Sequence, residues 1–301
     1  MRRPAAGRRG ARPRGFTLVE IAVVIVVLSL LLAMIAGIGT AMLGQQRREA
    51  TRQRLAGVET ALALFVSQHQ RLPCPANGTL DGTNANAGLE QFTAGAPNTC
   101  SVAGVADSQR HGVLPWRSLG LSEQDATDGW GNRLTYRVST HFITTPAMNM
   151  TYCDPGGTKA GPEALAAPGG YCDPTCASST FPASCTLPSE VTRTRGLEVR
   201  NLAAALIMNP NANPSTGAAY VVVSHGENGK GAYNNQGILQ GPAWTAGTED
   251  EEKKNDASLA LAAHYVDDFF VDSGAVHFDD FVLRPSLLTV ATKAQLGPRA
   301  H

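Results

Sequence analysis

The chain has 301 residues, with 25 acidic and 25 basic side chains, so its formal charge is zero. The distribution is uneven: six arginines and no acid lie in the first fourteen residues, and after Arg54 the chain carries 23 acidic and 15 basic residues, about −8. A body of that charge argues against a surface that binds nucleic acid.

An uncharged apolar run, residues 21–43, follows Glu20. As a helix it would measure about 35 Å, which is enough to cross a bilayer. A cleaved secretory signal is the alternative, but its apolar region is usually only about 7–15 residues long and ends at an A-x-A-like site, and no convincing site of that kind follows here. The leading arginines place the N-terminus in the cytoplasm, so the body lies outside it.

Glu20 is an unexpected residue at the start of such a run. A carboxylate within a hydrophobic span costs roughly 2.5–3.5 kcal/mol. If the chain is cut between Gly15 and Phe16, the new α-amine of Phe16 lies four residues before Glu20. Pairing between the carboxylate and the amine of an adjacent copy would then set the register of an assembly, since buried ion pairs contribute specificity more than stability. The helix dipole also favours an acid in the first turn.

Residues 14–20, RGFTLVE, and the apolar run after them resemble the prepilin leader of type IV pilins and type II secretion pseudopilins. The resemblance implies cleavage after Gly15 by a prepilin peptidase, methylation of the Phe16 amine, and docking of Glu20 in a growing filament. It also implies other pilins or pseudopilins and an inner-membrane assembly platform as partners. The topology would be single-pass in the bacterial inner membrane, with a cytoplasmic N-terminus and a periplasmic head. A plain signal anchor is the alternative interpretation.

Beyond the apolar run the helical pattern continues, with Leu55, Val58, Leu62 and Phe65 at every third or fourth position, until Pro73 ends it. The sequence thus predicts a leader at residues 1–15 and a stalk helix at residues 16–72, spanning the membrane at about 21–43. The outer apolar face is expected to pack on a sheet.

Residues 73–301 form the predicted head. Residues 73–100 are rich in Gly, Asn, Ala and Pro, which indicates a long loop. The segment 128–136, DGWGNRLTY, has turn residues that lead into an alternating strand, and it is similar to the segment that opens the sheet in many pseudopilins. Trp130 and Tyr136 are expected in the core.

The cysteines all follow the apolar run, where an oxidising compartment favours disulfides, although the sequence leaves their pairing open. One disulfide between Cys74 and Cys100 would close the long loop and contribute roughly 3 kcal/mol. The other four lie in a cysteine-rich insert at about residues 148–190, where a zinc site is the alternative, but the spacing lacks the usual close couples. The six are Cys74, Cys100, Cys153, Cys172, Cys176 and Cys185.

The segment 218–231 reads as a buried strand followed by a glycine turn, and it is similar to the pseudopilin turn that precedes a calcium-binding loop. Acids after it could supply several of the about six to eight oxygens that calcium prefers, with a solvated acidic loop as the alternative. No other cofactor is expected. The acids are Glu249, Asp250, Asp256, Asp267 and Asp268.

The predicted fold class is α+β: a long N-terminal helix packed on a C-terminal antiparallel β-sheet head with disulfide-rich loops. The predicted function is structural, a minor pilin or pseudopilin of a type IV pilus or type II secretion system, and not an enzyme. The alternatives are a signal-anchored extracytoplasmic enzyme or binding protein, and a DNA-uptake pilin. Ser224 and His225 are adjacent on a strand and point to opposite faces, so they make a poor nucleophile–base pair.

Overall fold

A computed structural model describes residues 17–93, 96–100, 109–145, 147–150, 195–212, 215–241, 243–258, 264–273 and 275–297 of the chain. For residues 35–41, 93, 96–99 and 109–111 it describes the backbone only. The chain divides into two compact units, Met1–Gln46 and Arg47–His301, and helix α1 (Leu18–His69) contributes residues to both.

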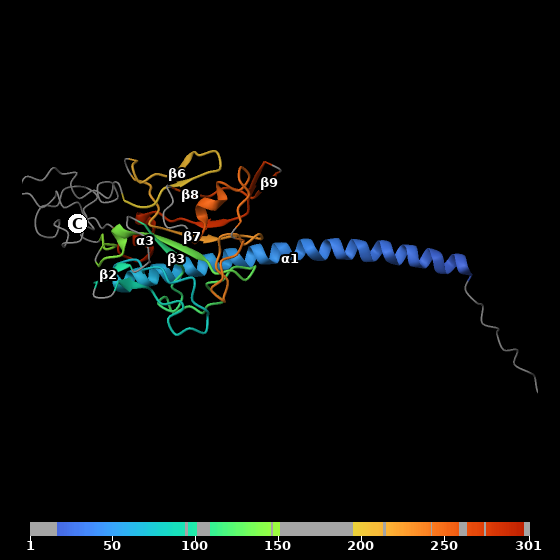
Figure 1. Cartoon of the computed structure of the whole chain (residues 1–301), viewed down its shortest axis with the longest axis horizontal. Coiled ribbons are helices and arrows are strands. Elements are labelled where there is room, and N and C mark those ends of the chain that lie inside the picture. Colours follow the sequence, from blue (N-terminus) through green and yellow to red (C-terminus); the bar gives the residue numbers. More distant parts are fainter. Residues whose placement is uncertain are drawn as a thin grey trace, which may run out of the picture. The chain divides into compact units, whose positions relative to one another are not determined.

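The larger unit is built on a four-stranded antiparallel sheet in the order β11-β7-β4-β3. Its strands are β3 (Gln109–Val113), β4 (Thr135–Ser139), β7 (Tyr220–Ser224) and β11 (Phe281–Leu283). Within this unit, α1 lies along the sheet (Figure 1). The helix and the antiparallel sheet confirm the α+β prediction.

Strand β7 is central and buried on both faces, which explains its continuous apolar sequence. Tyr220 and Val222 pack in the larger core, which α1 also enters, whereas Val221 and Val223 pack in a second core on the opposite face. Successive side chains of a strand point to opposite faces, so a strand covered on both sides has no polar position to alternate with.

The outer part of α1 packs its apolar face against the sheet, as its spacing predicts. Leu55, Val58, Leu62 and Val66 are buried in the larger core. The helix ends where Gln70 adopts a left-handed conformation, with φ at 57°, and donates its N–H to the Val66 carbonyl. Such a residue is a common helix stop.

A second, three-stranded sheet in the order β6-β5-β8 covers the other face of β7. It consists of β5 (Val199–Arg200), β6 (Leu206–Met208) and β8 (Tyr265–Val266). The β5–β8 pair is parallel, which departs from the expected all-antiparallel head. Parallel partners need a long crossover, and here the chain between β5 and β8 supplies it.

The remaining described elements are short. The hairpin β1 (Phe92–Thr93) with β2 (Ala96–Cys100) and the hairpin β9 (Val271–Ser273) with β10 (Val276–Phe278) are antiparallel. Two 3-10 turns are η1 (Thr140–Phe142) and η3 (Glu252–Asn255). Helix α3 (Leu287–Lys293), capped by the Ser286 hydroxyl, packs in the larger core. Apart from residues 148–150, the predicted cysteine-rich insert lies outside the described residues.

Candidate functional site

The first turn of α1 is closed by a reciprocal pair of side chains, Thr17 and Glu20. The Glu20 carboxylate accepts from the Thr17 backbone N–H at 2.8 Å and from its hydroxyl at 3.0 Å, and the Thr17 hydroxyl oxygen accepts from the Glu20 N–H at 3.3 Å. The Thr17 carbonyl receives the Ile21 N–H at 3.2 Å. This is a capping box, in which threonine at the N-cap and glutamate three residues later satisfy each other's orphan donors.

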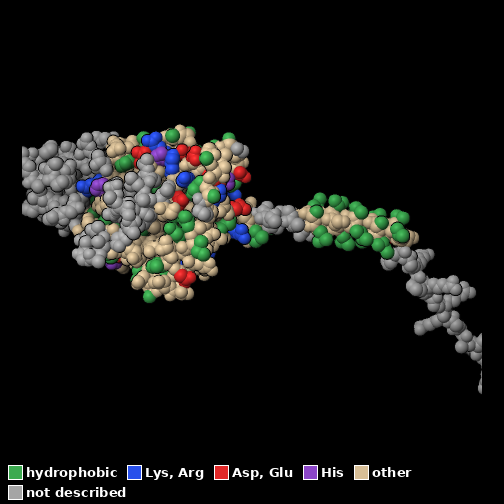
Figure 2. Space-filling view, in the orientation of Figure 1, with side chains coloured by type: hydrophobic (Ala, Val, Ile, Leu, Met, Phe, Trp, Pro, Cys, Tyr) green, Lys and Arg blue, Asp and Glu red, His purple; other side chains and the backbone are tan. Residues whose placement is uncertain are grey.

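Both Thr17 bonds end on one carboxylate oxygen of Glu20, Oε2. Within the described residues the other oxygen, Oε1, is left for a further donor. The helix beyond Glu20 is lined by exposed apolar side chains through residue 34 (Figure 2). Gly15 and Phe16, the predicted cleavage and methylation positions, lie outside the described residues.

Within the described part of the chain, no helix is both long enough and apolar enough to cross a membrane. The predicted span, residues 21–43, includes residues 35–41, whose side chains lie outside the description.

The family model of the prokaryotic N-terminal methylation motif matches residues 11–36. The chain carries the type IV pilin and pseudopilin signature. The resemblance predicted from residues 14–20 is therefore confirmed. The signature implies processing by prepilin peptidase and assembly with other pilins. No curated protein and no solved structure matches the chain.

Within the larger unit, the turn 128–132 joins α1 to the sheet through hydrogen bonds to both. Asp128 is buried, and its carboxylate accepts from the backbone N–H groups of Trp130 and Asn132, both at 2.9 Å, and from the Ser224 hydroxyl of β7 at 2.8 Å. On the helix side, the Gly129 N–H donates to the Thr51 hydroxyl at 2.9 Å. The segment DGWGN is thus a structural joint.

The prediction that Trp130 and Tyr136 belong to the core is confirmed for Tyr136, which is fully buried. Trp130 is half-buried and lies 5.9 Å from the ring of Phe281, measured between centroids. Trp130 is therefore not part of the buried core, and it lines a pocket instead.

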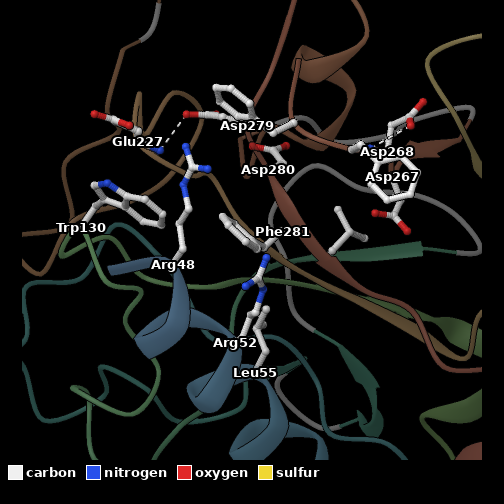
Figure 3. A pocket seen from close by; sticks show the side chains of 13 residues that line it. Arg48, Arg52, Leu55, Trp130, Glu227, Asp267, Asp268, Asp279, Asp280 and Phe281 are labelled. Carbon is white, nitrogen blue, oxygen red and sulfur yellow. Dashed lines mark hydrogen bonds between the residues drawn. The ribbon is translucent and has the colours of Figure 1, made fainter. Parts of the chain in front are cut away.

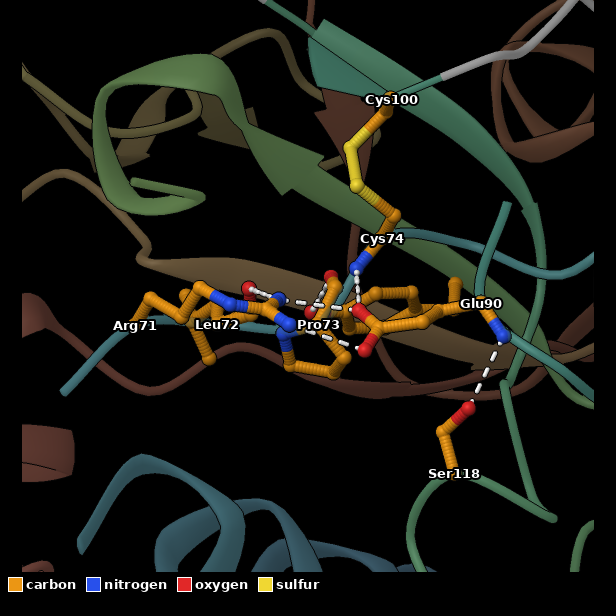
Figure 4. Close-up of a disulfide and its surroundings, with 8 residues drawn as sticks. Arg71, Leu72, Pro73, Cys74, Glu90, Cys100 and Ser118 are labelled. Carbon is orange, nitrogen blue, oxygen red and sulfur yellow. Dashed lines mark hydrogen bonds and ion pairs between the residues drawn. A yellow bond between two sulfur atoms is a disulfide. The ribbon is translucent and has the colours of Figure 1, made fainter. Parts of the chain in front are cut away.

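Cys74 and Cys100 form a disulfide, and they close the long loop that they bracket in the sequence (Figure 4). A charged clamp lies beside it: Arg71 binds both carboxylate oxygens of Glu90 at 2.9 Å, and Glu90 also accepts from the Cys74 N–H at 3.0 Å. A bidentate arginine–carboxylate pair is among the stronger charge-assisted contacts. The other four cysteines, Cys153, Cys172, Cys176 and Cys185, lie outside the described residues, and their disulfides stay a prediction.

The larger unit contains a cavity of about 300 Å³. It lies between residues 48–55 of α1 and residues 267–282. Arg48 and Arg52 project into it from α1 toward acidic and aromatic side chains (Figure 3). Arg48 lies 4.7 Å over the Phe270 ring and Arg52 lies 5.7 Å over the Phe281 ring, which are cation–π distances. The lining therefore offers charged and aromatic contacts.

The acids predicted to bind calcium each have their own protein partner. Glu249 pairs with Lys230 at 2.6 Å, and Asp267 with Arg284 at 2.5 Å. The other three accept backbone N–H groups: Asp250 from Gly247, Asp256 from Ser258, and Asp268 from Leu202 and Phe269. Calcium binding by Glu249, Asp250, Asp256, Asp267 and Asp268 stays a prediction.

The sequence did not single out a cluster that the structure does assemble: Glu252, His277 and Asp279, whose ligand atoms lie within 4.8 Å of one another. Burial, with the neighbouring Asp279 carboxylate, raises the pKa of Glu252 to about 8. Burial also raises the pKa of the adjacent Asp280 well above its ordinary value. The signal for this cluster is the pair of buried acids beside a histidine in HFDD, residues 277–280, but its third member is distant in the sequence.

Proposed function

We propose that the protein is a pilin-like structural subunit, a minor pilin or pseudopilin, of a type IV pilus or a type II secretion pseudopilus. Prepilin peptidase cleaves it between Gly15 and Phe16, and the Phe16 amine is then methylated. The observation that carries this proposal is the methylation-motif match over residues 11–36. The signature favours a filament subunit over an enzyme.

In this proposal Glu20 is the assembly residue. The capping box holds one carboxylate oxygen through Thr17 and leaves the other for a donor from outside the helix. The methylated amine of Phe16 in a neighbouring copy is such a donor, and pairing in an apolar surrounding would fix the register between copies.

We further propose that residues 21–43 lie in the bacterial inner membrane, with the N-terminus in the cytoplasm and the head in the periplasm. Their apolar composition and the arginines ahead of them support this placement. The Cys74–Cys100 disulfide is consistent with an oxidising compartment for the head. The assembly platform and other pilins would be its partners.

The proposal is tested by the variant Glu20→Ala at matched expression. The measurement is the ratio of subunit in sheared filaments to subunit in inner membranes. We expect at least a tenfold fall in this ratio, with the Cys74–Cys100 disulfide still formed, because Glu20 and the disulfide belong to different compact units.

The matched control is Glu49→Ala, which removes another exposed acid of α1, one that contacts Arg52 at 3.9 Å and Gln53 at 3.2 Å. We expect this variant to enter filaments as the wild type does. Equal incorporation of all three proteins would contradict the role of Glu20 in docking.

A further inference from the structure

Glu252 of η3, His277 of β10 and Asp279, which follows β10, converge on one point. The imidazole Nε2 of His277 lies 3.8 Å from Oδ1 of Asp279. Glu252 is fully buried and Asp279 is 5% exposed, whereas the His277 side chain is 24% exposed. The cluster therefore lies just below the surface, with the histidine as its open side.

Each of the three side chains presents an atom without a hydrogen-bond partner. These atoms are Glu252 Oε2, His277 Nε2 and Asp279 Oδ1. A buried polar atom that is left unsatisfied costs about 1–3 kcal/mol, and more when it is charged. A single partner placed among the three side chains would satisfy these atoms together.

The second oxygen of each carboxylate is held by the turn that follows β7. Asp279 Oδ2 accepts from the backbone N–H groups of Glu227 at 2.7 Å and Asn228 at 2.9 Å, and the contact with Glu227 is drawn in Figure 3. Glu252 Oε1 accepts from the Asn228 side chain at 2.9 Å. These bonds orient the free oxygens, so the arrangement is built and not a chance gathering of acids.

Gly226 is what lets this turn close around Asp279. Its φ is +55°, and a Cβ at this position would lie 2.3 Å from the Asp279 carbonyl oxygen and 2.5 Å from its carboxyl carbon. Only glycine adopts this conformation without strain and leaves that space open.

A second carboxylate orients the histidine of the cluster. His277 Nδ1 lies 3.4 Å from Oδ1 of Asp272, across the β9–β10 hairpin. With the proton on Nδ1, directed to the Asp272 carboxylate, Nε2 carries the free lone pair. A carboxylate behind an imidazole is the usual support of a metal-binding histidine.

We propose that Glu252, His277 and Asp279 bind a divalent transition-metal ion, with zinc as the probe ion. One imidazole nitrogen with two carboxylate oxygens suits zinc, whereas calcium prefers ligands that are all oxygen. Tetrahedral zinc with bonds of about 2.0–2.2 Å places its ligand atoms about 3.3–3.6 Å apart, close to the 3.8 Å between His277 and Asp279. Within the described residues, neither carboxylate forms an ion pair with a lysine or arginine, so a cation would supply the missing charge.

A proton shared between Glu252 and Asp279 is the competing explanation. It would satisfy both carboxylates, but it would leave His277 Nε2 without a partner. The metal accounts for all three atoms.

The test is equilibrium dialysis of the purified, oxidised full-length protein against zinc, followed by metal analysis and compared with His277→Gln. We expect the variant to bind about one zinc ion per chain fewer than the wild type. The matched control is His264→Gln, since His264 is another part-buried histidine beside an acid, 3.8 Å from Glu251. It should bind zinc as the wild type does. Zinc held by cysteines would be the same in all three proteins, so the difference between the variants reports on the cluster alone.

A second variant, Asp272→Asn, tests the orienting role, because loss of a carboxylate behind a metal-bound histidine typically weakens affinity about 10–100-fold. Calcium in tenfold excess should not displace the zinc. Equal zinc content in the wild type and His277→Gln would overturn the proposal and leave the shared proton as the explanation. Displacement by calcium would overturn the assignment to a transition metal.

Discussion

Replacing Asp128 should separate the geometric role of its carboxylate from the role of its charge. Asp128 accepts the N–H groups of Trp130 and Asn132 through Oδ1 and the Ser224 hydroxyl through Oδ2, and it is almost fully buried. Asp128→Ala deletes all three acceptor contacts. Asp128→Asn keeps an oxygen for the two N–H groups, and its amide can donate to the Ser224 oxygen instead.

The two variants should differ in stability by a measurable amount. Each buried donor left without an acceptor costs about 1–3 kcal/mol, and the Ser224 hydroxyl can rotate toward another acceptor. We therefore expect Asp128→Ala to lower the free energy of unfolding by about 3 kcal/mol. Burial raises the pKa of Asp128, so the charged carboxylate is disfavoured in the folded chain, and this cost is present above the folded pKa. Asp128→Asn avoids it and should lose less than about 1 kcal/mol at pH 7.

The assay is urea denaturation of the oxidised protein, followed by tryptophan fluorescence, with Trp130 as a reporter beside the site. Equal losses in the two variants would mean that the negative charge, and not the acceptor geometry, holds the turn. A loss below about 1 kcal/mol for Asp128→Ala would refute the assignment of this turn as the joint between α1 and the sheet.

Two further predictions concern the larger unit. Replacing both Cys74 and Cys100 by Ser opens a loop with a sequence separation of 26 residues. Loop-closure entropy predicts a loss of about 3.5 kcal/mol in the free energy of unfolding. An unchanged urea midpoint would show that the Arg71–Glu90 clamp is sufficient to hold the loop without the disulfide. Burial lowers the pKa of His225 to about 3, against about 6.5 in the unfolded chain, so protons bind only the unfolded state between these values and stability falls as the pH falls. From pH 6.5 to 5.5 the wild type should lose about 1 kcal/mol more than His225→Gln, whereas parallel profiles would indicate an ordinary pKa.

The features that the sequence predicts are those encoded locally. The face formed by Leu55, Val58 and Leu62 follows from helical spacing alone, and the buried strand β7 follows from its unbroken apolar run. The processing motif is also contiguous, so residues 14–20 were enough to predict what the match over residues 11–36 confirms. Composition and spacing were sufficient in each case because the physical cause lies within a few residues.

Features that depend on register between distant segments could not be predicted. The cluster of Glu252, His277 and Asp279 joins η3 to the β9–β10 hairpin, and only the folded turn after β7 orients its oxygens. The sequence directed attention to the run of acids that begins at Glu249, and Glu252 belongs to that run, but nothing local indicates that Glu252 meets His277 and Asp279. The parallel β5–β8 pair was missed for the same reason, since nothing in either two-residue strand specifies its partner.

Mass spectrometry of the N-terminus of the protein purified from its own cells tests the central claim most directly. A processed pilin-like subunit begins at a methylated Phe16 and has lost the arginine-rich leader, residues 1–15. Replacing Gly15 with a bulky residue should leave that leader attached, because the peptidase then meets a side chain at the cleavage position. A wild-type chain that begins at Met1, or at any residue beyond Thr17, would contradict the account.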